Sequence, residues 1–280
     1  MTRRFGAALA LSNVTVSFSP GEVHVLVGGN GAGKGTLIKI LSGADSDYRG
    51  ELWLEGAKVR FRNPSQARAL GIACIYQELS LVPNLSLVEN IGLRRSSRSS
   101  FCPSLFAGAA RGAAREEAKR LRCLMQLEVD LDREVRAFSL AEQQLIEVGA
   151  ALLEEVGVLV LDEPTSALSE REAECLFEHL QRARAAGTSV IYISHRLEEV
   201  YRLADRISVL RDGELVLTAW ASDLPQPELV RAMVGVVGQR PPRRGDEAAE
   251  RSAASRPNQC FASTHWNDPV SRDWKMFGCR

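Results

Sequence analysis

The chain has 280 residues, of which 45% are hydrophobic and 25% are charged, and this balance is typical of a soluble globular protein with a substantial core. Its 35 basic residues equal its 35 acidic residues, so the chain lacks the net positive charge that favours nucleic acid as a partner. The 6 cysteines show no spacing typical of a zinc site and are interpreted as small apolar residues of a reducing cytosol.

Residues 1–11 begin with a basic pair and continue into a short apolar stretch, which superficially resembles a secretory signal. No convincing cleavage site follows, and the sequence runs directly into a strand pattern. No apolar run is long enough to cross a bilayer. We therefore expect a cytosolic protein that works at a membrane only through a partner.

The first part of the sequence predicts a small β-lobe. Between Leu11 and Val27, strand patterns are separated by Ser19-Pro20-Gly21, which has the composition of a turn. Residues 50–61 predict two further short strands on either side of Glu55-Gly56.

A glycine-rich loop follows the apolar run 22–27 and precedes a helical pattern that stops at Gly43. The spacing of Gly28, Gly33 and Lys34 fits the P-loop pattern. Glycines let successive amides turn toward an anion, and the lysine adds a positive charge for the outer phosphates. The predicted phosphate-binding residues are Gly28, Gly29, Asn30, Gly31, Ala32, Gly33, Lys34, Gly35 and Thr36.

One position departs from this pattern. A P-loop has Ser or Thr directly after the lysine, because that hydroxyl binds the magnesium ion. Here the residue is Gly35, and Thr36 comes one place later. The sequence therefore supports phosphate binding more strongly than hydrolysis.

Three buried-strand patterns end in polar residues that can bind magnesium, hold a water or transfer a proton. The carboxyl ends of such strands are where α/β sheets place their chemistry. These strands and the residues that follow them are 72–76 with Gln77, 156–161 with Asp162 and Glu163, and 188–193 with Ser194 and His195.

The region between Asn84 and Ala137 differs from the strand patterns on either side of it and predicts an inserted helical lobe. This lobe includes a charged amphipathic helix from about Ala113 to Leu127. Ser139 predicts the N-cap of a following helix with an apolar inner face. The remaining patterns are helices near 170–186, 196–204 and 229–234, and a hairpin at Asp212-Gly213.

Five phrases in order resemble the nucleotide-binding subunits of ABC transporters, most closely those of bacterial monosaccharide importers: GGNGAGKGT, IYQELSLVPNLSLVENI, FSLAEQQLIEV, LVLDEPTSALSE and VIYISHRLEEV. The resemblance covers about Phe5 to Gly235. It implies an α/β fold, a P-loop NTPase (ABC ATPase) core with a small antiparallel β-lobe and an inserted helical lobe. The implied parts are 1–76, nucleotide-binding core with β-lobe; 77–150, helical lobe with the signature helix; 151–237, remainder of the core; and 238–280, a disordered tail.

The resemblance also implies how the nucleotide is held. Phe5, in a phrase like the family's aromatic loop, would stack on adenine. Lys34 and the amides of 30–36 would hold the β- and γ-phosphates. Ser139 would bind the γ-phosphate of the nucleotide on the opposite subunit, with Ser166-Ala167-Leu168 lining the same junction in a head-to-tail dimer.

The same resemblance assigns roles in hydrolysis. Gln77 would sense magnesium and the attacking water, and Asp162 would act through magnesium and its waters. Glu163 would be the general base, and His195 would reach the γ-phosphate and link Glu163 to the other subunit.

The implied protein is the ATP-binding subunit of a sugar import system, with ATP and Mg²⁺ as cofactors, at the cytoplasmic face of the bacterial cell membrane. Its implied partners are a second ABC ATPase module, membrane permease subunits and, indirectly, an exported sugar-binding protein. One alternative is a hydrolysis-impaired, regulatory or vestigial module, which Gly35 favours and Glu163 and His195 oppose. Another is an ABC ATPase of DNA repair or translation, which the short helical insert and the neutral charge oppose.

The sequence also departs from the family. Leu140 and Ala141 replace the small residues after the signature serine, and Leu140 is expected to crowd the backbone approach. The chain opens at the aromatic-loop phrase and holds one module where these importers usually fuse two. We therefore expect a truncated copy whose β-lobe has an unpaired edge.

Overall fold

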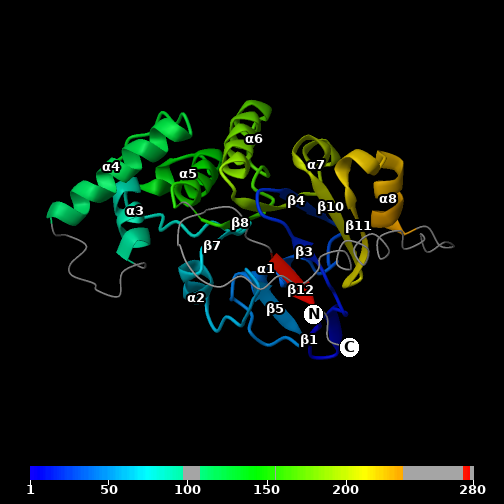
Figure 1. The fold of residues 1–280 in the computed structure, drawn as a ribbon. Coiled ribbons are helices and arrows are strands. Elements are labelled where there is room, and N and C mark those ends of the chain that lie inside the picture. Colours follow the sequence, from blue (N-terminus) through cyan, green and yellow to red (C-terminus); the bar gives the residue numbers. More distant parts are fainter. Residues whose placement is uncertain (97–107, 155, 236–273, 278–280) are drawn as a thin grey trace, which may run out of the picture.

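The computed structural model describes residues 1–96, 108–154, 156–235 and 274–277 (Figure 1). Its centre is a six-stranded sheet in the order β11-β10-β4-β9-β8-β7. Neighbouring strands from β10 to β7 are parallel, and β11 pairs with β10 in the antiparallel sense. The strands are β4 (Val23–Val27), β7 (Ile72–Ile75), β8 (Val158–Asp162), β9 (Ser189–Ile193), β10 (Arg206–Arg211) and β11 (Glu214–Trp220).

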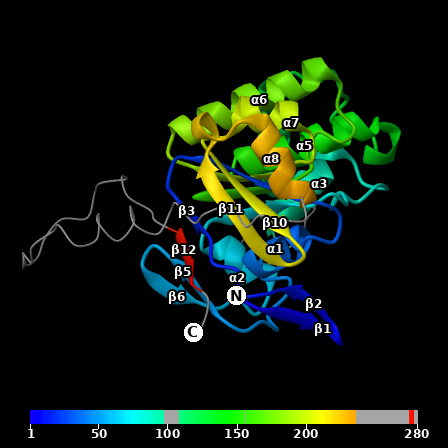
Figure 2. The ribbon, with the colours of Figure 1, turned by 90° about the vertical axis from the view of Figure 1, so that its right-hand side faces the viewer.

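The central strands are continuous apolar runs because helices cover both faces of the sheet. In β8, Val158 and Val160 join the core cluster that contains helix α1 (Lys34–Leu41), whereas Leu159 and Leu161 join the cluster of the opposite face. Figures 1 and 2 show α1 on one side of the sheet and α6 and α7 on the other. The bounds on that side are α6 (Glu170–Ala185), α7 (Leu197–Leu203) and α8 (Gln226–Val234).

The predicted antiparallel β-lobe is confirmed. It contains a two-stranded hairpin and a four-stranded sheet in the order β3-β12-β5-β6. Glu55 and Gly56 both have positive φ, 51° and 77°, which is the backbone of the tight hairpin turn that this residue pair predicts. The elements of the lobe are β1 (Arg3–Phe5), β2 (Ala8–Leu11), β3 (Ser17–Phe18), β5 (Glu51–Leu54), β6 (Ala57–Val59), β12 (Trp274–Phe277) and the adjoining helix α2 (Pro64–Ala69).

Residues 274–277 differ from the prediction of a disordered tail, because they form β12. This strand pairs with β3 on one side and with β5 on the other, so the strand edges that we expected to be unpaired have a partner. Backbone N–H and C=O groups at a sheet edge favour pairing with an extended segment. The rest of the predicted tail, 236–273 and 278–280, lies outside the described residues.

The inserted helices pack around a core cluster of their own, which includes Leu87, Ile91, Ala118, Leu121 and Ile146. The helices of this lobe are α3 (Leu87–Ser96), α4 (Gly108–Leu124) and α5 (Leu140–Leu152), with the short 3-10 helix η1 (Val135–Ala137) before α5. Helix α4 ends before the predicted Leu127, because Gln126 has a φ of 52° and left-handed backbone does not continue a helix.

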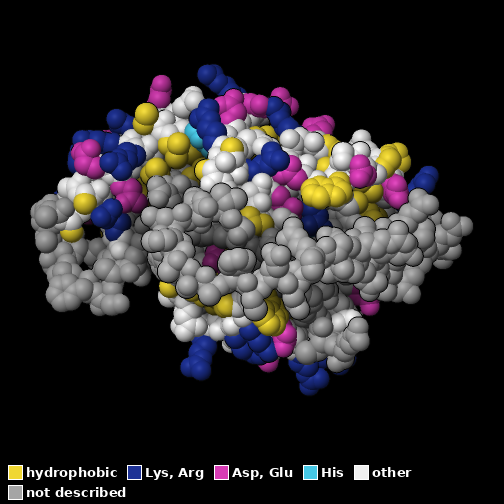
Figure 3. Space-filling model, in the orientation of Figure 1, with side chains coloured by type: hydrophobic (Ala, Val, Ile, Leu, Met, Phe, Trp, Pro, Cys, Tyr) yellow, Lys and Arg dark blue, Asp and Glu magenta, His cyan; other side chains and the backbone are white. Residues whose placement is uncertain are grey.

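Ion pairs such as Arg182 with Glu178 and Arg202 with Glu174 lie on the outer helices. Figure 3 accordingly shows basic and acidic side chains interspersed over the helices on the face that it draws. A second 3-10 helix, η2 (Ala221–Asp223), precedes α8. None of the helices within the described ranges combines the length and the apolar character that crossing a bilayer requires.

The place of β12 between two strands generates a prediction for Lys275→Pro. Lys275 is opposite Ser17 on one side and Trp53 on the other, and proline removes the N–H group from this doubly paired position. We expect a loss of about 2 kcal/mol in the free energy of unfolding, measured by urea denaturation followed by circular dichroism. Lys275→Ala is the matched control, and equal stability of the two variants would contradict the pairing.

Candidate functional site

The predicted site residues follow four adjacent parallel strands. Register pairs Leu26 of β4 with Ile193 of β9, Ile193 with Asp162 of β8, and Leu161 of β8 with Ile75 of β7. The four strands therefore end at the same level of the sheet, and the loops that follow them meet at one edge. This edge brings together the glycine-rich loop, Gln77, Asp162, Glu163 and His195, as the sequence predicts.

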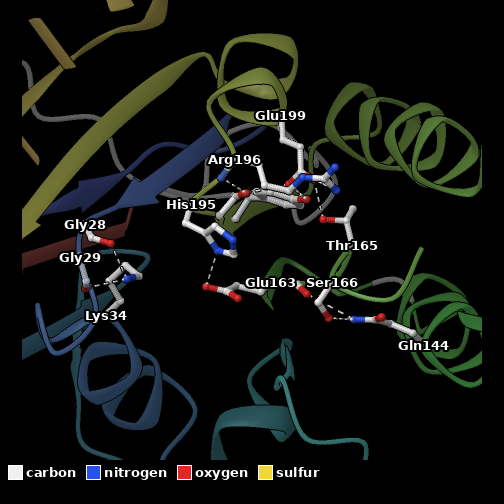
Figure 4. Close-up of polar contacts among 12 residues, drawn as sticks. Gly28, Gly29, Lys34, Gln144, Glu163, Thr165, Ser166, His195, Arg196 and Glu199 are labelled. Carbon is white, nitrogen blue, oxygen red and sulfur yellow. Dashed lines mark hydrogen bonds and ion pairs between the residues drawn. The ribbon is translucent and has the colours of Figure 1, made fainter. Parts of the chain in front are cut away.

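At two positions of the glycine-rich loop, a side chain would be strained or would clash with neighbouring atoms. Gly33, the residue before α1, has a φ of 102°, and a Cβ atom at Gly28 would lie 2.2 Å from the carbonyl oxygen of Leu210. Lys34 Nζ donates to the carbonyl oxygens of Gly28 at 2.7 Å and Gly29 at 3.1 Å (Figure 4). The ammonium group thus lies over the loop, and the helix N-terminus behind it favours a bound anion.

Lys34 and the two acidic residues form one electrostatic cluster. Burial lowers the pKa of Lys34, and the negative charges of Glu163 and Asp162 act in the opposite direction. Burial raises the pKa of Asp162, the charge of Glu163 raises it further, and Lys34 opposes both effects. An anionic ligand beside Lys34 and a cation beside Asp162 would relieve these costs.

Glu163 and His195 form a pair across two strands (Figure 4). The distance from Glu163 Oε1 to His195 Nδ1 is 3.0 Å. Glu163 has a φ of 49°, and its backbone N–H donates to the carbonyl oxygen of Ile193 at 3.0 Å. A carboxylate next to an imidazole at the mouth of a phosphate-binding loop can take a proton from a water.

Gln77 is exposed and begins a loop that two buried side chains hold. Glu147 of α5 accepts from the backbone N–H of Ser80 at 3.0 Å, and Asn90 of α3 accepts from the backbone N–H of Val82 at 2.7 Å. Our sequence reasoning missed both anchors. For Glu147 a signal existed, since a carboxylate occurs on an otherwise apolar inner face of its helix.

Two other predicted nucleotide-binding residues come from different elements. Ser139 is confirmed as the N-cap of α5, where its hydroxyl accepts from the Glu142 backbone N–H at 3.2 Å and completes a capping box. Leu140 beside it is 60% exposed. Phe5 is 48% exposed on β1, and the guanidinium carbon of Arg3 lies 4.3 Å from its ring centroid.

Further residues that the sequence analysis missed support the loop after β8. Gln144 of α5 donates from Nε2 to the carbonyl oxygen of Glu163 at 3.3 Å, and lies 3.5 Å from Ser166 Oγ. Glu199 of α7 accepts from Thr165 Oγ1 at 2.7 Å. Figure 4 shows these side chains on either side of the loop that carries Glu163.

The residues of the edge fit a nucleoside triphosphate better than they fit magnesium. The loop offers backbone amides and Lys34, whereas the oxygen donors for magnesium are Asp162 and Gln77, and Gly35 offers no hydroxyl. A Cβ atom at Gly35 would meet no heavy atom within 4 Å, so the hydroxyl is missing although there is room for it. Within the described residues, no three His, Cys, Asp or Glu side chains gather to form a metal site.

A family model described as ABC transporter matches residues 11–166. The chain is 43% identical over 235 residues to ribose import ATP-binding protein RbsA 3 of Rubrobacter xylanophilus, covering 84% of this chain and 46% of that protein. It is also 43% identical over 246 residues to ribose import ATP-binding protein RbsA of Chromobacterium violaceum, covering 87% of this chain and 48% of that protein. The chain therefore spans about half the length of these relatives.

Solved structures share the fold. The dimeric post-hydrolysis state of the ATP-binding cassette MJ0796 bound to ADP and Pi has a TM-score of 0.68 and 25% identity, and the match covers 79% of this chain and 95% of that chain. A nucleotide-free ATP-binding cassette from an ABC transporter has a TM-score of 0.70 and 23% identity, and the match covers 85% of this chain and 97% of that chain. These matches and the family model confirm the fold that the sequence predicts.

The raised pKa of Asp162 generates a prediction about stability. A carboxyl group whose pKa is higher in the folded than in the unfolded state costs stability once the pH exceeds the folded value. Asp162→Asn removes that charge, so we expect the Tm of the ligand-free protein at pH 7 to rise by on the order of 2 °C.

The difference between the two proteins should shrink as the pH falls through the raised pKa of Asp162 and vanish below about 3.9, the ordinary value for aspartate, because the carboxyl group is then protonated in both states. Calorimetry at several pH values measures this difference in Tm. A Tm of Asp162→Asn below that of the native protein at pH 7 would contradict this account.

Proposed function

We propose a function for this chain, which belongs to the ABC transporter family. It is the ATP-binding subunit of a sugar import system and couples ATP binding and hydrolysis to transport. The proposal rests on one observation, which is that Lys34, Asp162, Glu163 and His195 lie at the same sheet edge. The glycine-rich loop beside them has positions where a side chain would clash. The relatives named for ribose import supply the class of transported molecule.

Each residue at the edge has a part in this chemistry. Lys34 and the loop amides bind the β- and γ-phosphates, and Phe5 offers a half-exposed ring to the adenine. Glu163 takes a proton from the attacking water, and His195 holds Glu163 through the contact of 3.0 Å. Magnesium, when bound, neutralises charge on the phosphate oxygens, and Asp162 and Gln77 would hold it.

The proposed partners follow from the exposed elements. The N-terminus of α5, with Ser139 and the exposed Leu140, would face the nucleotide of a second ATPase module in a head-to-tail dimer, and the similar cassette MJ0796 is described as dimeric. The loop 77–85 would contact membrane permease subunits, which receive sugar from an exported binding protein. The proposed location is the cytoplasmic face of the bacterial cell membrane, and nucleic acid is not among the proposed partners.

The alternative of a hydrolysis-impaired module rests on Gly35. The Glu163 and His195 pair is formed, and the named relatives are import proteins, so the sugar-import ATPase is favoured.

Release of phosphate from ATP with magnesium tests the proposed activity. We expect Glu163→Gln to lower kcat by at least about 100-fold, because an amide cannot accept the proton of the attacking water. Binding of ATP, measured by calorimetry, should change little, since Lys34 and the loop are intact. Equal phosphate release by the native protein and Glu163→Gln would contradict hydrolysis at this site.

Gly35→Ser tests the incomplete set of magnesium ligands. A Cβ atom at this position meets no heavy atom within 4 Å outside the neighbouring residues and backbone of its own helix. The serine supplies a hydroxyl next to Lys34, so we expect the magnesium concentration for half-maximal phosphate release to fall by about 3-fold or more. Gly35→Ala is the matched control, because it removes the helix cost of glycine, roughly 1 kcal/mol, without adding an oxygen. The same fall in Gly35→Ala would show that helix stability, and not the hydroxyl, is responsible.

A further inference from the structure

A buried carboxylate lies behind the catalytic pair. Glu199 of α7 is 5% exposed. Its Oε1 accepts from Thr165 Oγ1 at 2.7 Å and forms an ion pair with Arg196 Nη1 at 3.0 Å. Its Oε2 accepts from Tyr192 at 3.0 Å and from Ser194 Oγ at 2.7 Å. The carboxylate therefore accepts three hydrogen bonds and forms one ion pair (Figure 4).

Two of these donors come from the two loops that carry the catalytic pair. Thr165 lies two residues after Glu163, and Ser194 lies directly before His195. The Ser194 hydroxyl also accepts from the backbone N–H of Arg196 at 3.0 Å, so the residues on both sides of His195 belong to the same network. One carboxylate thus ties the loop after β8 to the loop after β9.

The loop after β8 needs such support. Glu163 has a φ of 49°, and left-handed backbone at a residue other than glycine costs about 1 kcal/mol unless its surroundings enforce it. The backbone bond from Glu163 to Ile193, at 3.0 Å, holds one side of this residue. The bond from Thr165 to Glu199, at 2.7 Å, holds the other.

A buried charge is a poor means of stabilising a fold, because its desolvation offsets most of what its hydrogen bonds contribute. Its advantage is geometric, since three directed hydrogen bonds and one ion pair restrict the arrangement of the groups around it. Burial also raises the pKa of Tyr192, so the phenol keeps its proton and anchors the carboxylate to β9.

We propose that Glu199 is a positioning residue that sets Glu163 and His195 at their working separation, through Thr165 on one loop and Ser194 on the other. It acts on no reactant itself. The proposal deepens the proposed function and rests on it, because the positioned pair is the one assigned to ATP hydrolysis.

The first test is kinetic and uses Thr165→Val, which keeps the shape of the side chain and removes the hydroxyl that reaches Glu199. We expect kcat for phosphate release to fall by about 10-fold or more, with KM for ATP within about 2-fold, because a displaced loop moves the base without changing the phosphate loop. Thr165→Ser keeps a hydroxyl and should restore kcat to within about 3-fold of the native value.

Two control variants separate positioning from general stability. Val200→Ala removes buried apolar atoms from the same helix but leaves every donor to Glu199 in place, and Glu198→Gln neutralises the neighbouring carboxylate, which is exposed on the same helix. Both should keep kcat within about 2-fold of the native value. If Val200→Ala lowers kcat as much as Thr165→Val, Glu199 is a core residue without a positioning role and the proposal is overturned.

The second test does not depend on activity. Amide hydrogen exchange of the ligand-free protein should be faster in Thr165→Val than in the native protein at 163–168 and 194–197, and unchanged in β4. Faster exchange in both loops of a protein that does not hydrolyse ATP would support the coupling by Glu199 and refute the proposed function. Unchanged exchange in the loop at 194–197 would refute the coupling, whatever the activity.

Discussion

The hydrogen-bond register of four parallel strands is the constraint on which the site depends. Because β4, β9, β8 and β7 end at the same level, the loops that follow them share one edge. The phosphate-binding loop comes from the first of these strands, the histidine from the second, the carboxylates from the third and the glutamine from the fourth. A shift of one residue in any pair would move a side chain to the wrong face of the sheet.

The loops at this edge are held by buried polar side chains of the surrounding helices. Glu147 and Asn90 hold the loop that begins with Gln77, and Gln144 contacts the loop that carries Glu163. Glu199 holds that same loop and the one that carries His195. Gln144 and Glu147 both belong to α5, the helix that Ser139 caps, so this helix contacts the loop that carries Glu163 as well as the loop that begins with Gln77. These helix side chains therefore connect the three loops to one another.

The charged side chains at this edge would be stabilised by a bound ligand. Lys34 is partly buried beside two carboxylates, and burial raises the pKa of Asp162, so the ligand-free site holds charges at a cost that a nucleotide and its cation would relieve. Gly35 lacks the hydroxyl that a P-loop provides for magnesium at this position, although the surroundings leave space for a side chain. The proposed nucleotide site thus has Lys34, Asp162, Glu163 and His195 in place and no hydroxyl at position 35.

The sequence by itself determined the glycine-rich loop, the strands that end in Gln77, Asp162, Glu163 and His195, and the cap at Ser139, because local spacing and periodicity carry those features. The fold class came from the resemblance of five phrases to a known family. Tertiary structure alone decided which polar residues anchor the loops and that 274–277 pair between β3 and β5. Glu198 and Glu199 show the reason. They are identical neighbours in sequence, yet one is exposed and the other is 5% exposed, with three hydrogen-bond donors and one ion-pair partner. Burial and partners come from segments distant along the chain, and a local pattern does not contain them.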